Sequence, residues 1–181
     1  MRDLYVNETV TLRLLKTEDA QSLYEQVCAS QEHLFPFMPW VGNYTSAAAA
    51  QKFIEQKLKD LERQKGLAMG IFLNQNLIGV IGIERWDHYL KVAEIGYWLT
   101  KTETNKGIMF KALKTFLGHI FHTLKLEKVE IRCLPENERS IYLAKKLGAR
   151  QEGVLRHAFK INGQVNALVV LGILKSEWTD D

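Results

Sequence analysis

Residues 92–109 read Val-Ala-Glu-Ile-Gly-Tyr-Trp-Leu-Thr-Lys-Thr-Glu-Thr-Asn-Lys-Gly-Ile-Met and join two different patterns of apolar residues. The first eight positions form a mainly apolar run, which predicts a strand over residues 92–99. From Gly107 to Leu124, apolar residues recur at spacings of three and four, which predicts the clearest helix of the chain. The sequence therefore predicts a strand, a short polar loop and a helix in direct succession.

The loop between this strand and this helix has the chemistry of an anion-binding site. The first N–H groups of a helix have no partner within the helix, and the helix dipole adds positive potential beside them. Lys106 adds a charge, and Gly107 allows the backbone to approach a ligand closely. The loop therefore predicts a phosphate site, with an ordinary polar connection as the alternative.

The rest of the chain alternates between strand and helix patterns on both sides of this unit. Thr17 is expected to cap the first helix, and Gly66 is expected to end the second. Strands are predicted over residues 9–15, 67–73, 77–84, 129–133, 150–156 and 167–174, and the other helices over residues 17–28, 45–64 and 138–148. The order βααβββαβαββ predicts one mixed sheet with helices on its faces.

A short apolar segment, residues 34–40, reads Leu-Phe-Pro-Phe-Met-Pro-Trp and interrupts the helix pattern. Its two prolines do not fit inside a helix, so the segment is expected to be an ordered loop. Loops this apolar line a binding site or cover a core. We expect Phe35, Phe37 and Trp40 to contact a substrate, with a role as a lid on the core as the alternative.

Length and charge limit the class of protein. The chain has 181 residues, 46% of them hydrophobic and 25% charged, which predicts a single domain over residues 1–181 with a core that needs no disulfide or metal. Lys and Arg number 24 against 21 Asp and Glu, and the two signs are interspersed. A net charge of +3 without a basic run disfavours direct binding to nucleic acid.

Neither a membrane partner nor a metal is expected. The sequence contains no apolar run near the roughly 20 residues of a spanning helix and no signal-peptide pattern, so we expect a cytoplasmic protein. Cys28 and Cys133 lie far apart, which excludes the spacing of a zinc or redox pair. His119 and His122 lack a third ligand nearby and are expected to be solvated helix residues.

Two further positions are candidates for chemistry. Asn137 precedes a predicted helix and is explained as its N-cap, whereas Ser140 in the first turn is free to present its hydroxyl to a ligand. Glu94 stands between two apolar residues of the predicted strand 92–99. We expect its carboxylate to be either the structural partner of a buried polar group or a general base that acts through water.

Seven motifs in succession resemble the GNAT acetyltransferases, in particular their RimJ/RimL-type branch, which acetylates protein N-termini. The resemblance covers nearly the whole chain. The motifs are Leu12-Arg13-x-Leu, Pro39-Trp40, Ala93-Glu94-Ile95-Gly96-Tyr97-Trp98-Leu99, Lys106-Gly107-Ile108-Met109, Glu130-Ile131-Arg132-Cys133, Asn137-x-x-Ser140, and Lys146-Leu147-Gly148-Ala149 with Glu152-Gly153.

This resemblance implies an α/β (α+β) GNAT fold with a mixed, mostly antiparallel sheet and helices on both faces. In that fold the fourth and fifth strands, here residues 92–99 and 129–133, splay apart and hold the pantetheine arm of acetyl-CoA. The resemblance makes acetyl-CoA the cosubstrate and implies no metal. The residues expected to bind it are Trp98, Leu99, Thr100, Thr104, Asn105, Lys106, Gly107, Ile108, Met109, Asn137 and Ser140.

Two departures from the family pattern concern the site directly. The phosphate loop of the family usually reads Gln/Arg-Gly-x-Gly, whereas this chain has Thr104-Asn105-Lys106-Gly107, so altered affinity for CoA is expected. The position that often holds a general-acid tyrosine is Ala144 here. Ser140 is then the nearest candidate for the acid.

The resemblance implies an N-acetyltransferase that moves acetyl from acetyl-CoA to a primary amine, foremost the α-amine of a protein N-terminus such as that of a ribosomal protein. The amine would attack the thioester directly, and N–H groups at the end of strand 92–99 would stabilise the oxyanion. Two alternatives stay open: an acetyltransferase for a small amine such as a polyamine or an amine drug, and a non-catalytic acyl-CoA-binding module. Self-association into a homo-oligomer is also left open.

Overall fold

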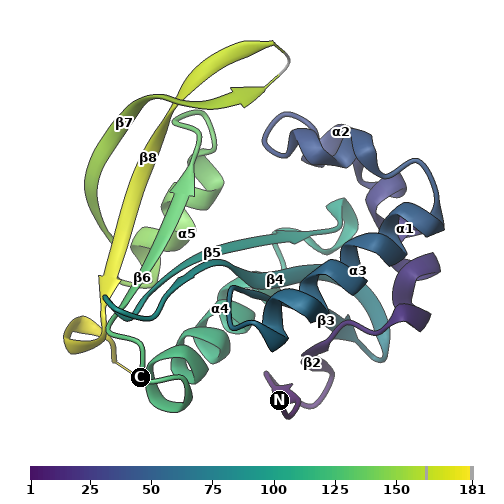
Figure 1. Cartoon of the computed structure of the whole chain (residues 1–181), viewed down its shortest axis with the longest axis horizontal. Helices are drawn as coiled ribbons and strands as arrows, with labels where there is room; N and C mark the ends of the chain where they lie inside the picture. Colours follow the sequence, from purple (N-terminus) through teal and green to yellow (C-terminus); the bar gives the residue numbers. More distant parts are fainter. Residues whose placement is uncertain (162, 180–181) are drawn as a thin grey trace.

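The computed structural model describes residues 1–161 and 163–179, and its centre is an eight-stranded sheet with the order β1-β2-β3-β4-β5-β6-β8-β7 (Figure 1). Neighbouring strands are antiparallel except β5 and β6, which are parallel. The strands are β1 Leu4–Tyr5, β2 Val10–Leu14, β3 Leu67–Leu73, β4 Asn76–Asp87, β5 Val92–Leu99, β6 Lys128–Cys133, β7 Arg150–Ile161 and β8 Gln164–Leu174. The expected mixed, mostly antiparallel sheet is confirmed.

Helices cover both faces of this sheet (Figure 1). They are α1 Ala20–Ala29, α2 Gln31–Leu34, α3 Ala47–Glu62, α4 Ile108–Gly118 and α5 Glu138–Lys146. Alternate residues of β4 show the division, because Val80 packs in the core formed with α1 and α3, whereas Ile81 packs in the core formed with α4. The central strands are therefore buried on both faces, and their sequences are nearly continuous apolar runs.

The parallel pair β5 and β6 is joined only along part of its length. Its register runs from Val92 opposite Lys128 to Ile95 opposite Ile131 and stops there. The other edge of β5 stays paired with β4 as far as Leu99. Beyond Ile95 the two parallel strands therefore separate, which is the splay expected of the fourth and fifth family strands; they are β5 and β6 here because the short β1 precedes them.

Two expected helix boundaries are wrong. Thr17 does not cap α1, because residues Thr17–Asp19 form a 3₁₀ turn whose N-cap is Lys16. Helix α3 ends at Glu62, and Gln64 rather than Gly66 takes the left-handed backbone conformation, with φ 53°. Gly66 has a different function: a Cβ atom there would lie 2.5 Å from the carbonyl oxygen of Ile83, so only glycine allows this approach to β4.

The end of the strongest helix also differs from expectation. Regular α-helix stops at Gly118, and residues His119–Thr123 form a π-helical turn. His119 is buried rather than solvated, because it follows the buried Phe116 by three positions and so lies on the same face of the helix. Burial lowers the pKa of its imidazole, so His119 belongs to the neutral interior of the fold.

Candidate active site

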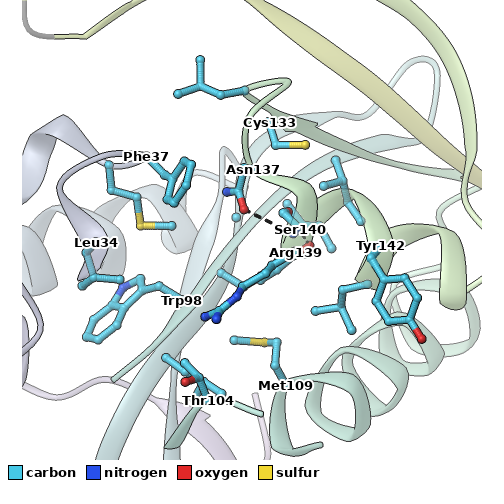
Figure 2. A pocket seen from close by; sticks show the side chains of 18 of the residues that line it. Leu34, Phe37, Trp98, Thr104, Met109, Cys133, Asn137, Arg139, Ser140 and Tyr142 are labelled. Carbon is cyan, nitrogen blue, oxygen red and sulfur yellow. Dashed lines mark hydrogen bonds between the residues drawn. The ribbon is translucent and has the colours of Figure 1, made fainter. Parts of the chain in front are cut away.

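A cavity of about 520 Å³ opens where β5 and β6 separate (Figure 2). Its walls come from β5 and β6, from α2 on one side and α4 and α5 on the other, and from Phe159 and Leu168 of the C-terminal hairpin. Segments distant in the sequence therefore meet at this one place. Most of the residues that the family resemblance assigned to acetyl-CoA lie on its walls.

The floor of the cavity includes an unpaired strand edge. Residues Ile95 to Leu99 line the cavity, and the ladder to β6 ends at Ile95. In an antiparallel pair, alternate residues direct their N–H and C=O groups to the neighbouring strand, and the residues between them direct theirs the opposite way. Every second residue over 96–99 therefore presents backbone donors and acceptors to the cavity instead of to another strand.

The loop before α4 forms the next wall. Gly107 is the N-cap of α4 and has φ 75°, a left-handed conformation that favours glycine, and Asn105 has φ 64°. No side chain caps α4, so the first N–H groups of the helix keep their capacity to bind an anion. The cavity-lining residues of this segment are Glu103, Thr104, Asn105, Gly107, Ile108, Met109 and Phe110.

Two residues expected to bind acetyl-CoA lie outside the cavity lining. Lys106 does not line the cavity, and its Nζ lies 3.1 Å from the carboxylate of Glu103. Thr100 is buried and also lies outside the lining. Lys106 therefore pairs within the loop itself and does not direct its ammonium group into the cavity.

Helix α5 brings Asn137 and Ser140 to the cavity. The Oδ1 atom of Asn137 accepts a hydrogen bond from the backbone N–H of Ser140 at 3.2 Å, which is the expected N-cap (Figure 2). The hydroxyl of Ser140 shares a hydrogen bond of 2.9 Å with the hydroxyl of Tyr97. Since the cap uses only the backbone of Ser140, its hydroxyl takes no part in starting the helix.

Tyr97 is a site residue that our sequence analysis missed as an individual side chain. Burial raises the pKa of its phenol well above the usual value, so the group keeps its proton at neutral pH. Burial likewise raises the pKa of the Cys133 thiol, which also lines the cavity. Three neutral, hydrogen-bonding groups, Tyr97, Cys133 and Ser140, therefore lie at the centre of the site.

Glu94 lies at the closed end of the cavity, within an ion-pair network. Its Oε2 atom is 3.4 Å from Arg132 and 3.5 Å from Arg85. Arg132 also binds Glu130 at 2.9 Å, which lowers the pKa of that carboxyl against the effect of burial. These contacts account for Glu94 as a structural partner, and its action as a base through water stays a prediction.

Only one of the three expected substrate residues lines the cavity. Phe37 does, whereas Phe35 lies outside the lining. Trp40 packs into the second core, with ring centroids 5.3 Å from Tyr44 and 6.3 Å from Trp98. This packing fits the alternative, a lid on the core that supports the wall formed by Trp98, and a contact of Trp40 with substrate stays a prediction.

Neighbours of Phe37 complete the wall that the aromatic loop was expected to form. The structure adds His33, Leu34 and Met38 to the lining, and α2 carries the first two. Burial lowers the pKa of His33, and the charges of Arg139 and Lys101 lower it further. The sequence pattern gave no sign of His33, because nothing in residues 31–34 distinguishes it from a solvated helix residue.

The missing family tyrosine is not replaced from the same helix. Ala144 is completely buried, and Tyr142, although it lines the cavity, is 67% exposed and lies at its outer side (Figure 2).

Within residues 1–161 and 163–179, no group of three or more potential metal ligands comes together. No helix in the same part of the chain is long and apolar enough to cross a membrane.

Comparison with known proteins gives a consistent set of matches. A family model described as the acetyltransferase (GNAT) domain matches residues 9–150. YdaF of Bacillus subtilis, whose name assigns it provisionally as a ribosomal N-acetyltransferase, is 32% identical over 177 residues, 96% of this chain and 95% of YdaF. The ribosomal-protein-serine acetyltransferase of Escherichia coli is 28% identical over 157 residues, 87% of this chain and 88% of that protein.

A solved structure of a related acetyltransferase has the same fold as this chain. The microcin C7 self-immunity acetyltransferase MccE, crystallised with acetyl-CoA and AMP, superposes with a TM-score of 0.88 at 27% sequence identity. The superposition covers 93% of this chain and 94% of that one.

Proposed function

The chain belongs to the GNAT acetyltransferase family and is an acetyl-CoA-dependent N-acetyltransferase, and we propose that its acceptor is the α-amine of a protein N-terminus, of the ribosomal-protein type. One observation carries the assignment of the site. The edge of β5 beyond Ile95 is unpaired and faces a cavity that also contains the uncapped N-terminus of α4. Such an edge suits the amide groups of pantetheine, and such a helix end suits a phosphate.

The reaction follows from these groups. The neutral amine of the acceptor attacks the carbonyl carbon of the thioester, and the new C–N bond leaves a negative charge on the carbonyl oxygen. Backbone N–H groups of residues 96–99 that face the cavity would stabilise this oxyanion. The C–S bond then breaks and the amine proton passes to water. Ser140, whose hydroxyl is bonded to that of Tyr97, donates its proton to the CoA thiolate and regains one from water, so no charge stays on the protein.

The assignment of the acceptor rests on the name of a relative and on the acid–base chemistry of the site. The name of the Escherichia coli relative, a ribosomal-protein-serine acetyltransferase, supports a protein N-terminus. Two carboxylates line the cavity in the part of the chain that the structure describes, and both are paired: Glu94 with Arg85 and Arg132, and Glu103 with Lys106. Burial and the neighbouring cations lower the pKa of the His33 imidazole, which also lines the cavity, so it is a weak base. Such a site suits an amine that is already partly neutral near pH 7, as an α-amine is.

The test is a panel of acceptors incubated with acetyl-CoA, with release of the CoA thiol as the signal. The panel holds short peptides with free N-termini, the same peptides blocked at the N-terminus, spermidine and an amine antibiotic. We expect turnover with free N-terminal peptides. Turnover with spermidine or the antibiotic alone would favour the small-amine alternative, and CoA binding without turnover would favour the non-catalytic module.

Replacing Ser140 by alanine should lower kcat about 10- to 30-fold and leave the Kd of CoA nearly unchanged. A hydroxyl is a weak acid, and the thiol of CoA, like cysteine with a pKa of about 8.5, departs tolerably well without help, so the loss falls at the low end for acid–base catalysis. The cap of α5 uses only the Ser140 backbone, so the fold should be kept. Ser140→Cys, which restores a proton donor, should recover part of the rate, and an unchanged kcat in Ser140→Ala would exclude this role.

A further inference from the structure

Arg139 is a cavity-lining cation without an acidic partner. It lies in the first turn of α5, and in Figure 2 its side chain projects into the cavity toward the side where Trp98, Met109 and Thr104 lie. No acidic side chain lies within ion-pair distance of it among residues 1–161 and 163–179. A guanidinium stays charged at all relevant pH values, so this charge is available to a ligand.

The other ionised side chains of the cavity wall are already engaged. Glu94 and Arg132 pair with each other at 3.4 Å. Glu103 pairs with Lys106, and the Nζ of Lys146 lies 4.8 Å from the ring centroid of Phe110. Arg139 therefore differs from the other ionised groups on the wall.

The phosphate loop lacks a cation of its own. Lys106 lies outside the cavity lining and its Nζ pairs with Glu103, so at the cavity the loop offers backbone N–H groups and the α4 dipole. A helix N-terminus contributes roughly half an elementary charge, whereas a pyrophosphate diester carries one negative charge on each phosphorus. Part of that charge is left without compensation from α4.

Arg139 is positioned to bind the part of the pyrophosphate charge that α4 leaves uncompensated. With Leu143 and Lys146 it follows the spacing i, i+4, i+7, and all three residues line the cavity that the N-terminal residues of α4 also line. We propose that Arg139 binds the pyrophosphate of CoA from α5 and takes the place of Lys106, the loop cation that pairs with Glu103. The proposal rests on the proposed function, which places acetyl-CoA between α4 and α5.

Calorimetric titration of CoA and dephospho-CoA into three proteins tests the proposal: the wild type, Arg139→Gln and Lys145→Gln. Lys145 lies on the same helix and carries the same charge, but it does not line the cavity. We expect Arg139→Gln to weaken both ligands 10- to 30-fold, since both contain the pyrophosphate, and Lys145→Gln to change either by less than twofold. The dependence of the CoA affinity on salt should also become shallower in Arg139→Gln alone.

Each other outcome has a defined meaning. Equal losses in both variants would show a general effect of net charge, and a loss with CoA but not dephospho-CoA would place Arg139 on the 3′-phosphate; either overturns the assignment. An unchanged CoA affinity with a raised KM for the acceptor would show that Arg139 binds an anionic group of the acceptor instead. If the wild type binds CoA and Arg139→Gln binds it equally well, this inference alone fails, whereas a wild type that binds no CoA removes the proposed function as well.

Discussion

A peptide with a free N-terminal amine should be acetylated roughly 100-fold faster at pH 7 than the same peptide whose only amine is a lysine side chain. An α-amine with a pKa of about 7.7 to 8.0 is on the order of 10% neutral at this pH, whereas a lysine amine near 10.4 is neutral at about 0.04%. The greater nucleophilicity of the more basic amine recovers a small part of this ratio. The site adds little that could remove the lysine proton, because the carboxylates of Glu94 and Glu103 are paired with cations and the lowered pKa of His33 makes it a weak base.

The comparison is made as kcat/KM for two peptides of one sequence, one free at its N-terminus without lysine and one Nα-blocked with a single lysine. The rate with the first peptide should also rise with pH up to about the pKa of its own α-amine and then level off. Equal kcat/KM values for the two peptides would show that a group in the site acts as a strong base and removes the proton of the lysine amine.

Gly107→Val should weaken the binding of CoA by about 10- to 100-fold. Gly107 has φ 75°, and a residue with a side chain loses about 1–2 kcal/mol in this left-handed conformation, with more for a β-branched one. No heavy atom lies within 4 Å of a Cβ at this position, so the loss comes from the backbone and not from a clash. The loop would relax to another conformation and withdraw the first N–H groups of α4 from the phosphate.

Gly107→Asn is the matched control, because asparagine tolerates the left-handed region better than other residues with side chains, as Asn105 does with φ 64° in the same loop. Its Kd for CoA should stay within a few-fold of the wild type. Thermal unfolding of both variants shows whether the fold is kept. A folded Gly107→Val protein that binds CoA like the wild type would mean that the phosphate lies elsewhere.

The backbone of the site could be predicted from the sequence because it depends on local patterns. The strand 92–99, the loop and the helix after Gly107 follow from apolar periodicity and one glycine, and the structure has β5 and α4 at these places. The cap by Asn137 follows in the same way from a residue type at a helix start. These features require no knowledge of distant parts of the chain.

The side chains that face the cavity could be predicted less well, because their direction depends on partners far along the chain. Lys106 has the right type and position for a phosphate, but the neighbouring Glu103 holds it outside the cavity. Trp40 packs against Trp98, which lies 58 positions further on, and it does not line the cavity. The bond between Tyr97 and Ser140 likewise joins β5 to α5, and no pattern within either segment announces it.

The most direct measurement of the central claim is the position of the acetyl group on one peptide that contains both a free N-terminus and an internal lysine. The peptide is incubated with acetyl-CoA and the protein, the product is located by fragment mass spectrometry, and the CoA thiol is titrated in the same sample. The account predicts acetyl on the α-amine, with one thiol released per acetyl transferred. Acetyl on the lysine, or thiol release that is unchanged when the peptide is omitted, would contradict it.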